Sequence, residues 1–356
     1  MAGILTAVWA VIIFSVIIFV HEFGHFITAK AFGVLVHEFA IGMGPAIFKK
    51  QKGETLYAIR AIPIGGYCKM EGEENDSDNP RAFSKKNKLQ RLIILASGAL
   101  MNLILGFVLI VGLMSQNASS GFATLTVGEV LENSPAYEAG IQAGDKIIGV
   151  DGKNVSSSDE YRMYRKSDKE ALLKIKRDGE KLEIKVPSKE YKYDTETGEI
   201  VDISSERELP TVWLMGITFE TEDGNLFNLL KNSFKKLKFF SLMILNSLGQ
   251  ILTGKIGAEN LSGPVGIVNE ISTAAKSGFL EIIFLAALIT INLGLFNLLP
   301  FPALDGGRIL FIVIEAIIRK PVPAKYEGFF HFIGFALLIL LMIYATGNDI
   351  MRIFVR

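Results

Sequence analysis

Four stretches of the chain are apolar for long enough to cross a lipid bilayer, which takes about 20 residues in an α-helix. Polar segments with strand-like and helical patterns separate them. The apolar stretches cover residues 4–27, 92–114, 279–300 and 329–344. We therefore expect a polytopic α-helical membrane protein with about four transmembrane helices.

The first apolar stretch has a second interpretation, a cleavable signal peptide. No basic residue precedes its apolar run, and no small-residue cleavage site lies ahead of the polar residues that follow. A basic segment before the apolar run and a small-residue cleavage site after it are both typical of signal peptides. The prediction is therefore a retained first transmembrane helix over residues 1–30.

A fifth candidate span covers residues 227–253. Its first half carries four lysines, and its apolar residues recur at helical spacing. This pattern is typical of an amphipathic helix that lies in the membrane interface. The alternative, a fifth transmembrane helix, would reverse the orientation of everything after it.

A β-rich domain is predicted between the second and third spans, over residues 120–188. Apolar residues alternate there with Gly and Asp turns, and Asp178-Gly179 marks a hairpin. Its "SPAYEAGIQAGDKIIGVDGKNV" resembles the most recognisable part of bacterial PDZ domains, which bind an extended peptide by strand addition. A domain of this kind could bind a peptide C-terminus or act as a size filter, and both alternatives stay open. Residues 189–226 follow as a linker and a strand.

Basic residues predict the orientation, because cytoplasmic loops are enriched in Lys and Arg. They concentrate in residues 31–90 and in the loop after the third span. Both termini and the PDZ-like domain should therefore be extracytoplasmic, with the inner end of the first helix toward the cytoplasm. The remaining spans are predicted over 91–115, over 279–318 with a break, and over 328–347.

Composition narrows the class of protein. Half of the residues are apolar, and 37 basic residues balance 37 acidic ones, so charge gives no reason to expect nucleic-acid binding. Cys68 is the single cysteine, which excludes an internal disulfide and a Cys-based zinc site. A metal would have to be held by His, Asp or Glu.

The sequence "HEFGH" places His21, Glu22 and His25 at the end of the first apolar stretch. Four-residue spacing puts both imidazoles on one helix face, within reach of one ion. Ionisable groups in a membrane segment are costly and usually functional. A buried His pair bonded to carbonyls and a proton relay are the alternatives, but a metal explains all three residues together.

A catalytic zinc normally has three protein ligands and one open position. The candidate third ligand is Asp305, because Pro300, Pro302 and a Gly pair interrupt the third span around it. Irregular backbone at membrane depth is tolerated where protein or a wet cavity satisfies it. With four spans, Asp305 reaches the same side of the membrane as the two histidines.

Together these motifs resemble the site-2 intramembrane metalloproteases, regulator-of-sigma branch. The resemblance rests on HEFGH, on "NLLPFPALDGG" and on the PDZ-like segment between them. It implies a Zn²⁺ cofactor held by His21, His25 and Asp305, with Glu22 as the catalytic general base.

The resemblance also implies substrate-binding residues. Asn292 and Asn297 would contact the substrate, and so would a membrane-associated hairpin over residues 57–70, with Gly65, Gly66 and Tyr67. The hairpin would pair with an unwound substrate helix as an added strand.

The function predicted from the sequence is intramembrane cleavage of single-span membrane proteins in a bacterial cytoplasmic membrane. Anti-sigma factors and remnant signal peptides are the substrate types that the resemblance implies, with the lipid bilayer as the surroundings. Two alternatives come from other classes of protein. A proton-coupled transporter would show inverted repeats, and a silent scaffold would lack a ligand or the base.

Overall fold

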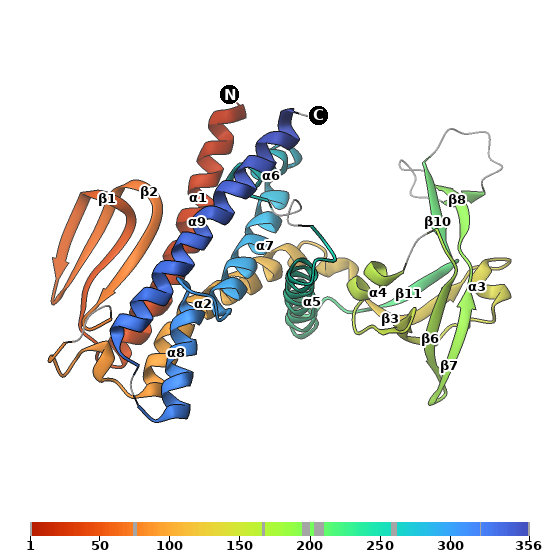
Figure 1. Cartoon of the computed structure of the whole chain (residues 1–356). Helices are drawn as coiled ribbons and strands as arrows, with labels where there is room; N and C mark the ends of the chain where they lie inside the picture. The colour runs from red at the N-terminus through yellow and green to blue at the C-terminus, as the bar shows by residue number, and fades with distance from the viewer. Residues whose placement is uncertain are drawn as a thin grey trace. The chain divides into compact units, whose positions relative to one another are not determined.

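The computed structural model describes residues 2–73, 77–165, 168–193, 200–202, 210–257, 262–320 and 322–354 (Figure 1). The chain divides into two compact units. The first contains Met1–Leu113 and Phe240–Arg356, and the second contains Met114–Phe239.

The first unit is mainly helical. Its helices are α1 (Ala2–Ala31), α2 (Lys88–Ser115), α6 (Pro264–Ser277), α7 (Phe279–Leu298), α8 (Asp305–Ile318), α9 (Ala324–Phe354) and the end of α5 (Leu226–Leu252). Within the described residues, four helices are long and apolar enough to cross a membrane, namely α1, α2, α7 and α9. The predicted number of four candidate spans is confirmed.

Small residues bring the first two spans into close contact. A Cβ atom at Gly24 of α1 would lie 2.5 Å from the carbonyl oxygen of Ser97 in α2. A Cβ at Gly294 of α7 would lie 2.9 Å from the carbonyl oxygen of Ala99. In membranes, helices associate through such close packing rather than through a hydrophobic driving force. Helix α2 is therefore held between α1 and α7.

A sheet of two long, bent strands packs beside α1 (Figure 1). The strands are β1 (Val36–Lys52) and β2 (Thr55–Met70). Residues 38–41 of β1 have Cα partners in both 56–59 and 66–69 of β2, because each strand bends near its middle. The prediction of a hairpin confined to residues 57–70 is therefore wrong. That segment is one strand, and its partner β1 lies earlier in the chain.

Helix α6 begins in the segment "LSGPVGI", and its position depends on α9. The backbone N–H of Gly266 donates to Oδ2 of Asp349, at 2.7 Å, and this carboxylate is buried. Side chains at Gly263 or Gly266 would collide with Asp349. A carboxylate at the N-terminus of a helix satisfies orphan N–H groups and favours the helix dipole. The two glycines thus let α9 cap α6.

The second unit contains a six-stranded sheet in the order β11-β3-β4-β6-β7, with β5 paired to β4. A second sheet has the order β10-β8-β9. Two short helices, α3 (Pro135–Glu138) and α4 (Ser158–Tyr164), connect strands of the larger sheet. The strands are β3 (Phe122–Val130), β4 (Lys146–Val150), β5 (Lys153–Asn154), β6 (Ala171–Arg177), β7 (Glu180–Val186), β8 (Lys189–Tyr193), β9 (Ile200–Asp202), β10 (Thr211–Leu214) and β11 (Ile217–Glu222).

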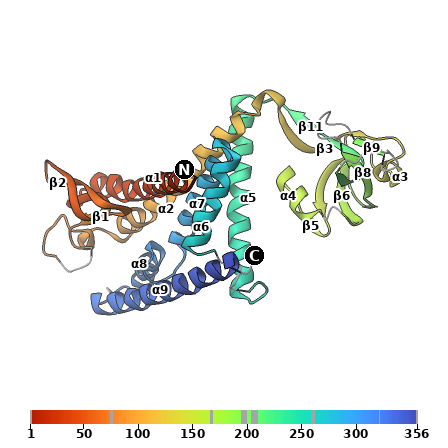
Figure 2. The same ribbon diagram turned by 90° about the horizontal axis from the view of Figure 1, so that it is seen from above.

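The β-rich domain extends beyond the predicted limit at residue 188. Strand β11 pairs with β3 at the end of the larger sheet (Figure 2). Met215, just before it, is 2% exposed and belongs to the same core as Leu173 and Ile175. The prediction assigned residues 189–226 to a linker and a strand, because the sequence signal of the domain ends at Val186. Long-range pairing, which a local pattern does not show, completes the fold.

Helix α5 (Leu226–Leu252) covers the segment predicted as amphipathic, and it is not among the four candidate spans. Its first half packs on the β-rich domain through Lys231, whose Nζ lies 2.5 Å from Glu222. Phe227 and Phe234 are 75% and 62% exposed. Exposed aromatic residues beside lysines are typical of interfacial helices.

The ion pair between Asp145 and Arg177 should make the stability of the β-rich domain depend on pH. Burial alone would raise the pKa of Asp145, but the Arg177 guanidinium and the Gln142 N–H lower it below its ordinary value. This contribution is therefore present at neutral pH and is lost as the pH falls below about 4 toward the folded-state pKa.

Replacing Asp145 by Asn should destabilise the domain at pH 7 by about 1–3 kcal/mol, because the buried network loses its negative charge and one of its two acceptor oxygens. The measurement is hydrogen exchange of β4 and β6 in the full-length protein. The difference between wild type and variant should shrink at pH 3. Glu180→Gln, at an exposed position, should match the wild type. A difference that stays constant with pH would contradict the assignment.

Candidate metal centre

Two imidazoles and one carboxylate meet in the first unit. His21 and His25 lie one turn apart on α1, and their Nε2 atoms are 3.3 Å apart. Oδ2 of Asp305, the first residue of α8, lies 3.2 Å from Nε2 of His21 and 3.3 Å from Nε2 of His25. The structure thus brings together the three residues predicted as metal ligands.

The triangle of these three atoms has the dimensions of a zinc site. With bonds of about 2.0–2.1 Å, the ligand atoms of a tetrahedral zinc site stand about 3.3 Å apart. Oδ2 of Asp305 is buried and has no hydrogen-bond partner in the described part of the chain. A buried carboxylate oxygen facing two imidazole nitrogens is well suited to a divalent cation. The residues present therefore fit zinc, with a fourth position open.

Second partners orient both imidazoles. Nδ1–H of His25 donates to the carbonyl oxygen of Ile94 at 2.8 Å, which leaves the lone pair of Nε2 free for a metal. Nδ1 of His21 lies 3.4 Å from the amide of Asn102. Asn102 is fully buried, and its Oδ1 has no partner among the described residues. If the side-chain amide of Asn102 is rotated by half a turn, its Oδ1 takes the place of Nδ2 and can accept a hydrogen bond from Nδ1–H of His21.

Asn102 is a site residue that the sequence interpretation missed. It belongs to α2, in the otherwise apolar run "SGALMNLILG". The signal was present, because an unpaired amide inside a membrane span is costly and therefore points to a partner. Nothing in the local sequence identifies that partner.

Helix α2 also limits the space behind the imidazoles. A Cβ atom at Gly98 would overlap Nε2 of His25 and would lie 2.8 Å from Cε1 of His21. One residue earlier, the hydroxyl of Ser97 lies 2.9 Å from that of Thr28 on α1. The backbone of α2 thus forms a wall against which both rings rest.

A turn between α7 and α8 positions Asp305. Helix α7 ends at Leu298, and the N–H of Phe301 donates to the carbonyl of Leu299 at 2.6 Å. Gly306 permits the next step, because a Cβ there would overlap the carbonyl oxygen of Leu299. The first turn of α8 can therefore lie directly on the end of α7, with Asp305 directed toward α1.

A cavity of about 920 Å³ surrounds the three ligand atoms. Glu22 lines it beside the histidines, and so do Tyr67 and Lys69 from β2. A Cβ atom at Gly66 would lie 3.4 Å from Cγ of Glu22, so the strand passes close to α1. Burial raises the pKa of the Cys68 thiol, which makes this cysteine unsuitable as a nucleophile.

The predicted substrate-binding residues fall into two groups. Tyr67 lines the cavity, and Gly65 and Gly66 precede it in β2, with Gly65 at a positive φ of 86°. Asn292 and Asn297 lie on α7, outside the described lining of the cavity. Asn297 is buried and Asn292 is exposed. The substrate-binding role of these two asparagines stays a prediction.

Comparisons with known proteins agree with this geometry. Residues 9–341 match the family model of peptidase family M50. A Clostridium perfringens protein whose name describes it as a zinc metalloprotease is 39% identical, over 96% of this chain and 98% of its own length. A similarly named Staphylococcus aureus protein is 32% identical, over 99% of this chain and all of its own length.

A third relative is the zinc metalloprotease RasP of Shouchella clausii. It is 32% identical, and the alignment covers 96% of this chain and 98% of the relative. The family match runs from within the first candidate membrane helix to within the last, and the relatives are aligned over nearly their whole lengths. The protein is therefore a multi-pass membrane protein that belongs to peptidase family M50, the site-2 protease family, and is a zinc metalloprotease.

Proposed function

We propose that the protein is an intramembrane endopeptidase whose zinc is held by His21, His25 and Asp305. The observation that carries the proposal is the spacing of 3.2–3.3 Å among the three ligand atoms. Two of them come from a helix that is apolar enough to cross the membrane. A protease built in this way would cut peptide bonds at membrane depth.

Glu22 is the proposed general base, since it lines the same cavity next to His21. Bound zinc polarises the scissile carbonyl and makes water a better nucleophile at neutral pH. Glu22 would accept the proton of the attacking water and later donate it to the leaving amine nitrogen. Water and substrate would reach this site through the cavity that Glu22, His21, His25 and Asp305 line.

The substrate would be presented by the edge of β2. Residues 66–70 pair with β1, and among the described residues they have no strand on their other side. A peptide bond within a helix is shielded by its own hydrogen bonds, so the substrate must unwind, and its freed N–H and C=O groups need partners. Strand addition at this edge provides them beside Glu22.

The end of the β1–β2 sheet away from residues 66–70 has a composition that supports a position of this sheet at the membrane surface. Five apolar residues there are 50–73% exposed. Lysines on the same strands would remain in water. A sheet end of this composition suits the cytoplasmic interface, which agrees with the orientation predicted from the basic loops. The five residues are Met43, Ile47, Phe48, Ile59 and Ile62.

The proposed substrates are single-span membrane proteins of a bacterial cytoplasmic membrane, such as anti-sigma factors or remnant signal peptides, in regulated intramembrane proteolysis. The support comes from the motif resemblance, from the similarity to the zinc metalloprotease RasP, and from the cavity of about 920 Å³ that Tyr67 and Lys69 of β2 line beside Glu22. Both termini and the β-rich domain would be extracytoplasmic, and the metal centre would lie toward the cytoplasm.

The β-rich domain is proposed to be PDZ-like and to bind the exposed end of a substrate. Strand β11 is at the edge of the larger sheet, and Gly216 just before it has a φ of 83°. Tyr161 of α4 stacks edge-on against Phe219 of β11, with ring centres 5.1 Å apart. An edge strand beside a helix is the arrangement that PDZ domains use for strand addition.

The assignment of the metal centre is tested by Glu22→Gln and Asp305→Asn in detergent-solubilised protein. Glu22→Gln should keep zinc and lose at least about 10²-fold in cleavage rate, because only proton transfer is removed. Asp305→Asn should lose both zinc and activity. Bound metal and cleavage of a single-span peptide are measured for each variant. Cleavage by Glu22→Gln at the wild-type rate would remove Glu22 from the chemistry.

Gly98→Ala should also weaken zinc retention, because its Cβ would displace the ring of His25. Alanine favours a helix by about 1 kcal/mol over glycine, so α2 itself should not suffer. The matched control is Gly112→Ala in the same helix, where a Cβ would have no neighbour within 4 Å. Equal zinc affinity in both variants, measured by chelator competition, would contradict the packing of α2 against the imidazoles.

Strand addition is tested by crosslinking in an inactive Glu22→Gln, Cys68→Ser background. Lys69→Cys lies on the proposed substrate edge of the sheet, and Lys50→Cys lies on the strand segment at the opposite edge. Both lysines are exposed. Single-cysteine substrates should crosslink to position 69 and not to position 50. The yield should alternate along the substrate with a period of two residues. Crosslinking without periodicity would exclude a strand.

A further inference from the structure

The turn that carries Asp305 contains a residue in an unfavourable backbone conformation. Ala303, two residues before Asp305, has a φ of 70°. The left-handed region costs free energy for any residue with a Cβ, and such residues persist only where their surroundings hold them. Something must therefore fix this turn, and the neighbours that do so also determine where the carboxylate lies.

Helix α9 provides that support. Nδ1 of His331 accepts a hydrogen bond from the backbone N–H of Ala303, at 2.9 Å. One turn further along α9, a Cβ at Gly334 would overlap Cβ of Pro302. The backbone of α9 therefore lies directly on Pro302 while His331 holds the next residue.

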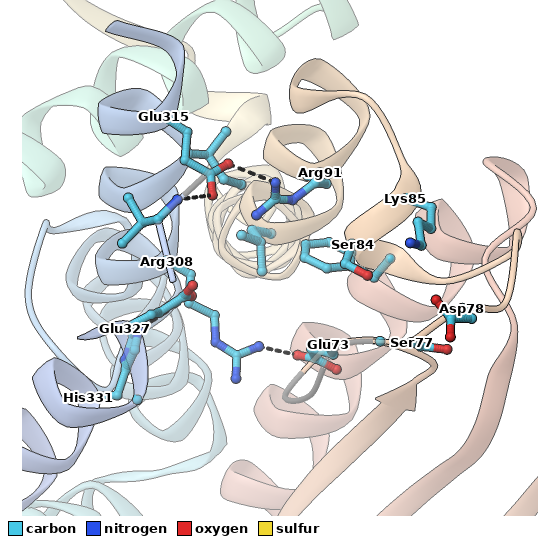
Figure 3. A pocket seen from close by; sticks show the side chains of 16 residues that line it. Glu73, Ser77, Asp78, Ser84, Lys85, Arg91, Arg308, Glu315, Glu327 and His331 are labelled. Carbon is cyan, nitrogen blue, oxygen red and sulfur yellow. Dashed lines mark hydrogen bonds and ion pairs between the residues drawn. The ribbon is translucent and has the colours of Figure 1, made fainter. Parts of the chain in front are cut away.

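The ring of His331 also touches the start of α8. A Cβ atom at Gly307 would lie 3.3 Å from Cε1 of His331. His331 thus contacts the chain on both sides of Asp305. Figure 3 shows His331 next to Glu327 at the border of a polar cavity, which Arg308 crosses to pair with Glu73.

The direction of the hydrogen bond defines the role of the ring. Because Ala303 N–H is the donor, Nδ1 must accept, and the ring proton is on Nε2. Nε2 lies 3.9 Å from Oε1 of Glu327. Residues that orient a metal ligand from outside the coordination sphere usually act through one such hydrogen bond.

We propose that His331 is a positioning residue for the metal centre. Through the N–H of Ala303, it holds the turn so that Oδ2 of Asp305 stands 3.2–3.3 Å from both imidazole nitrogens. The inference rests on the proposed role of Asp305 as a zinc ligand. It explains why α9, which contributes no ligand, bears a histidine and a glycine on the face that meets this turn.

Substitutions of His331 that keep or remove a hydrogen-bond acceptor for the N–H of Ala303 distinguish this positioning role from a role in packing alone. Asparagine at position 331 carries an oxygen close to the place of Nδ1, whereas leucine has similar bulk and no acceptor. Glutamine carries its amide one methylene further out and should not reach Ala303. Phe332→Leu is the matched control, because Phe332 is the next residue of α9 and is 68% exposed.

The experiment uses zinc-loaded full-length protein in detergent. Zinc release to a coloured chelator is measured, together with kcat and KM for a single-span peptide. His331→Leu should release zinc at least about tenfold faster and lower kcat by a similar factor, with KM little changed. His331→Asn and Phe332→Leu should resemble the wild type. Gly334→Ala, which pushes Pro302, should release zinc faster as well.

Two results would overturn the proposal. One is wild-type zinc retention in His331→Leu, and the other is equally fast release from His331→Asn and His331→Leu. If His331→Leu does not fold, zinc retention is compared between His331→Asn and His331→Gln. Equal zinc retention in these two variants overturns the proposal. Asp305→Asn is run in parallel. If it retains zinc, the proposed metal site fails; if it alone loses zinc, only the role of His331 fails.

Discussion

The convergence of three ligand atoms within 3.2–3.3 Å of one another is the constraint on which the rest of the structure depends. The ligands come from the first helix and from a helix near the other end of the chain. Neither position alone can hold a metal. Bringing α1 and α8 together requires that α2 packs closely on both α1 and α7, through glycines at the contacts, and that each imidazole has a second partner that fixes its orientation.

Glycine is the residue that makes this packing work. Gly24 and Gly98 let α1 and α2 touch, and Gly306 lets α8 start against the end of α7. A methyl group at any of these positions would collide with backbone or with an imidazole. In water such glycines would weaken a helix, but a membrane span is already stabilised by its internal hydrogen bonds. The glycines therefore reduce the stability of the helices little, and they allow the close contacts that position the metal ligands.

The same region combines irregular backbone with a free strand edge. The turn after α7 is satisfied by its own short hydrogen bonds and by His331, whereas residues 66–70 of β2 pair with β1 and have no second partner strand in the part of the chain that the structure describes. Buried backbone groups without partners are costly away from water. The open edge is therefore suited to a second strand, and this links the architecture of the sheet to the proteolysis proposed for the metal centre.

The sequence by itself determined the number of candidate spans, the HEFGH pair and the family, because apolar length and short motifs are local properties. It also singled out Asp305 as a candidate ligand. Only the tertiary structure decided that Asn102 backs His21, that β11 completes the β-rich domain and that the segment 57–70 is one strand of a longer sheet. Each of these depends on contacts between residues far apart in the chain, where hydrogen-bond partners are chosen by packing.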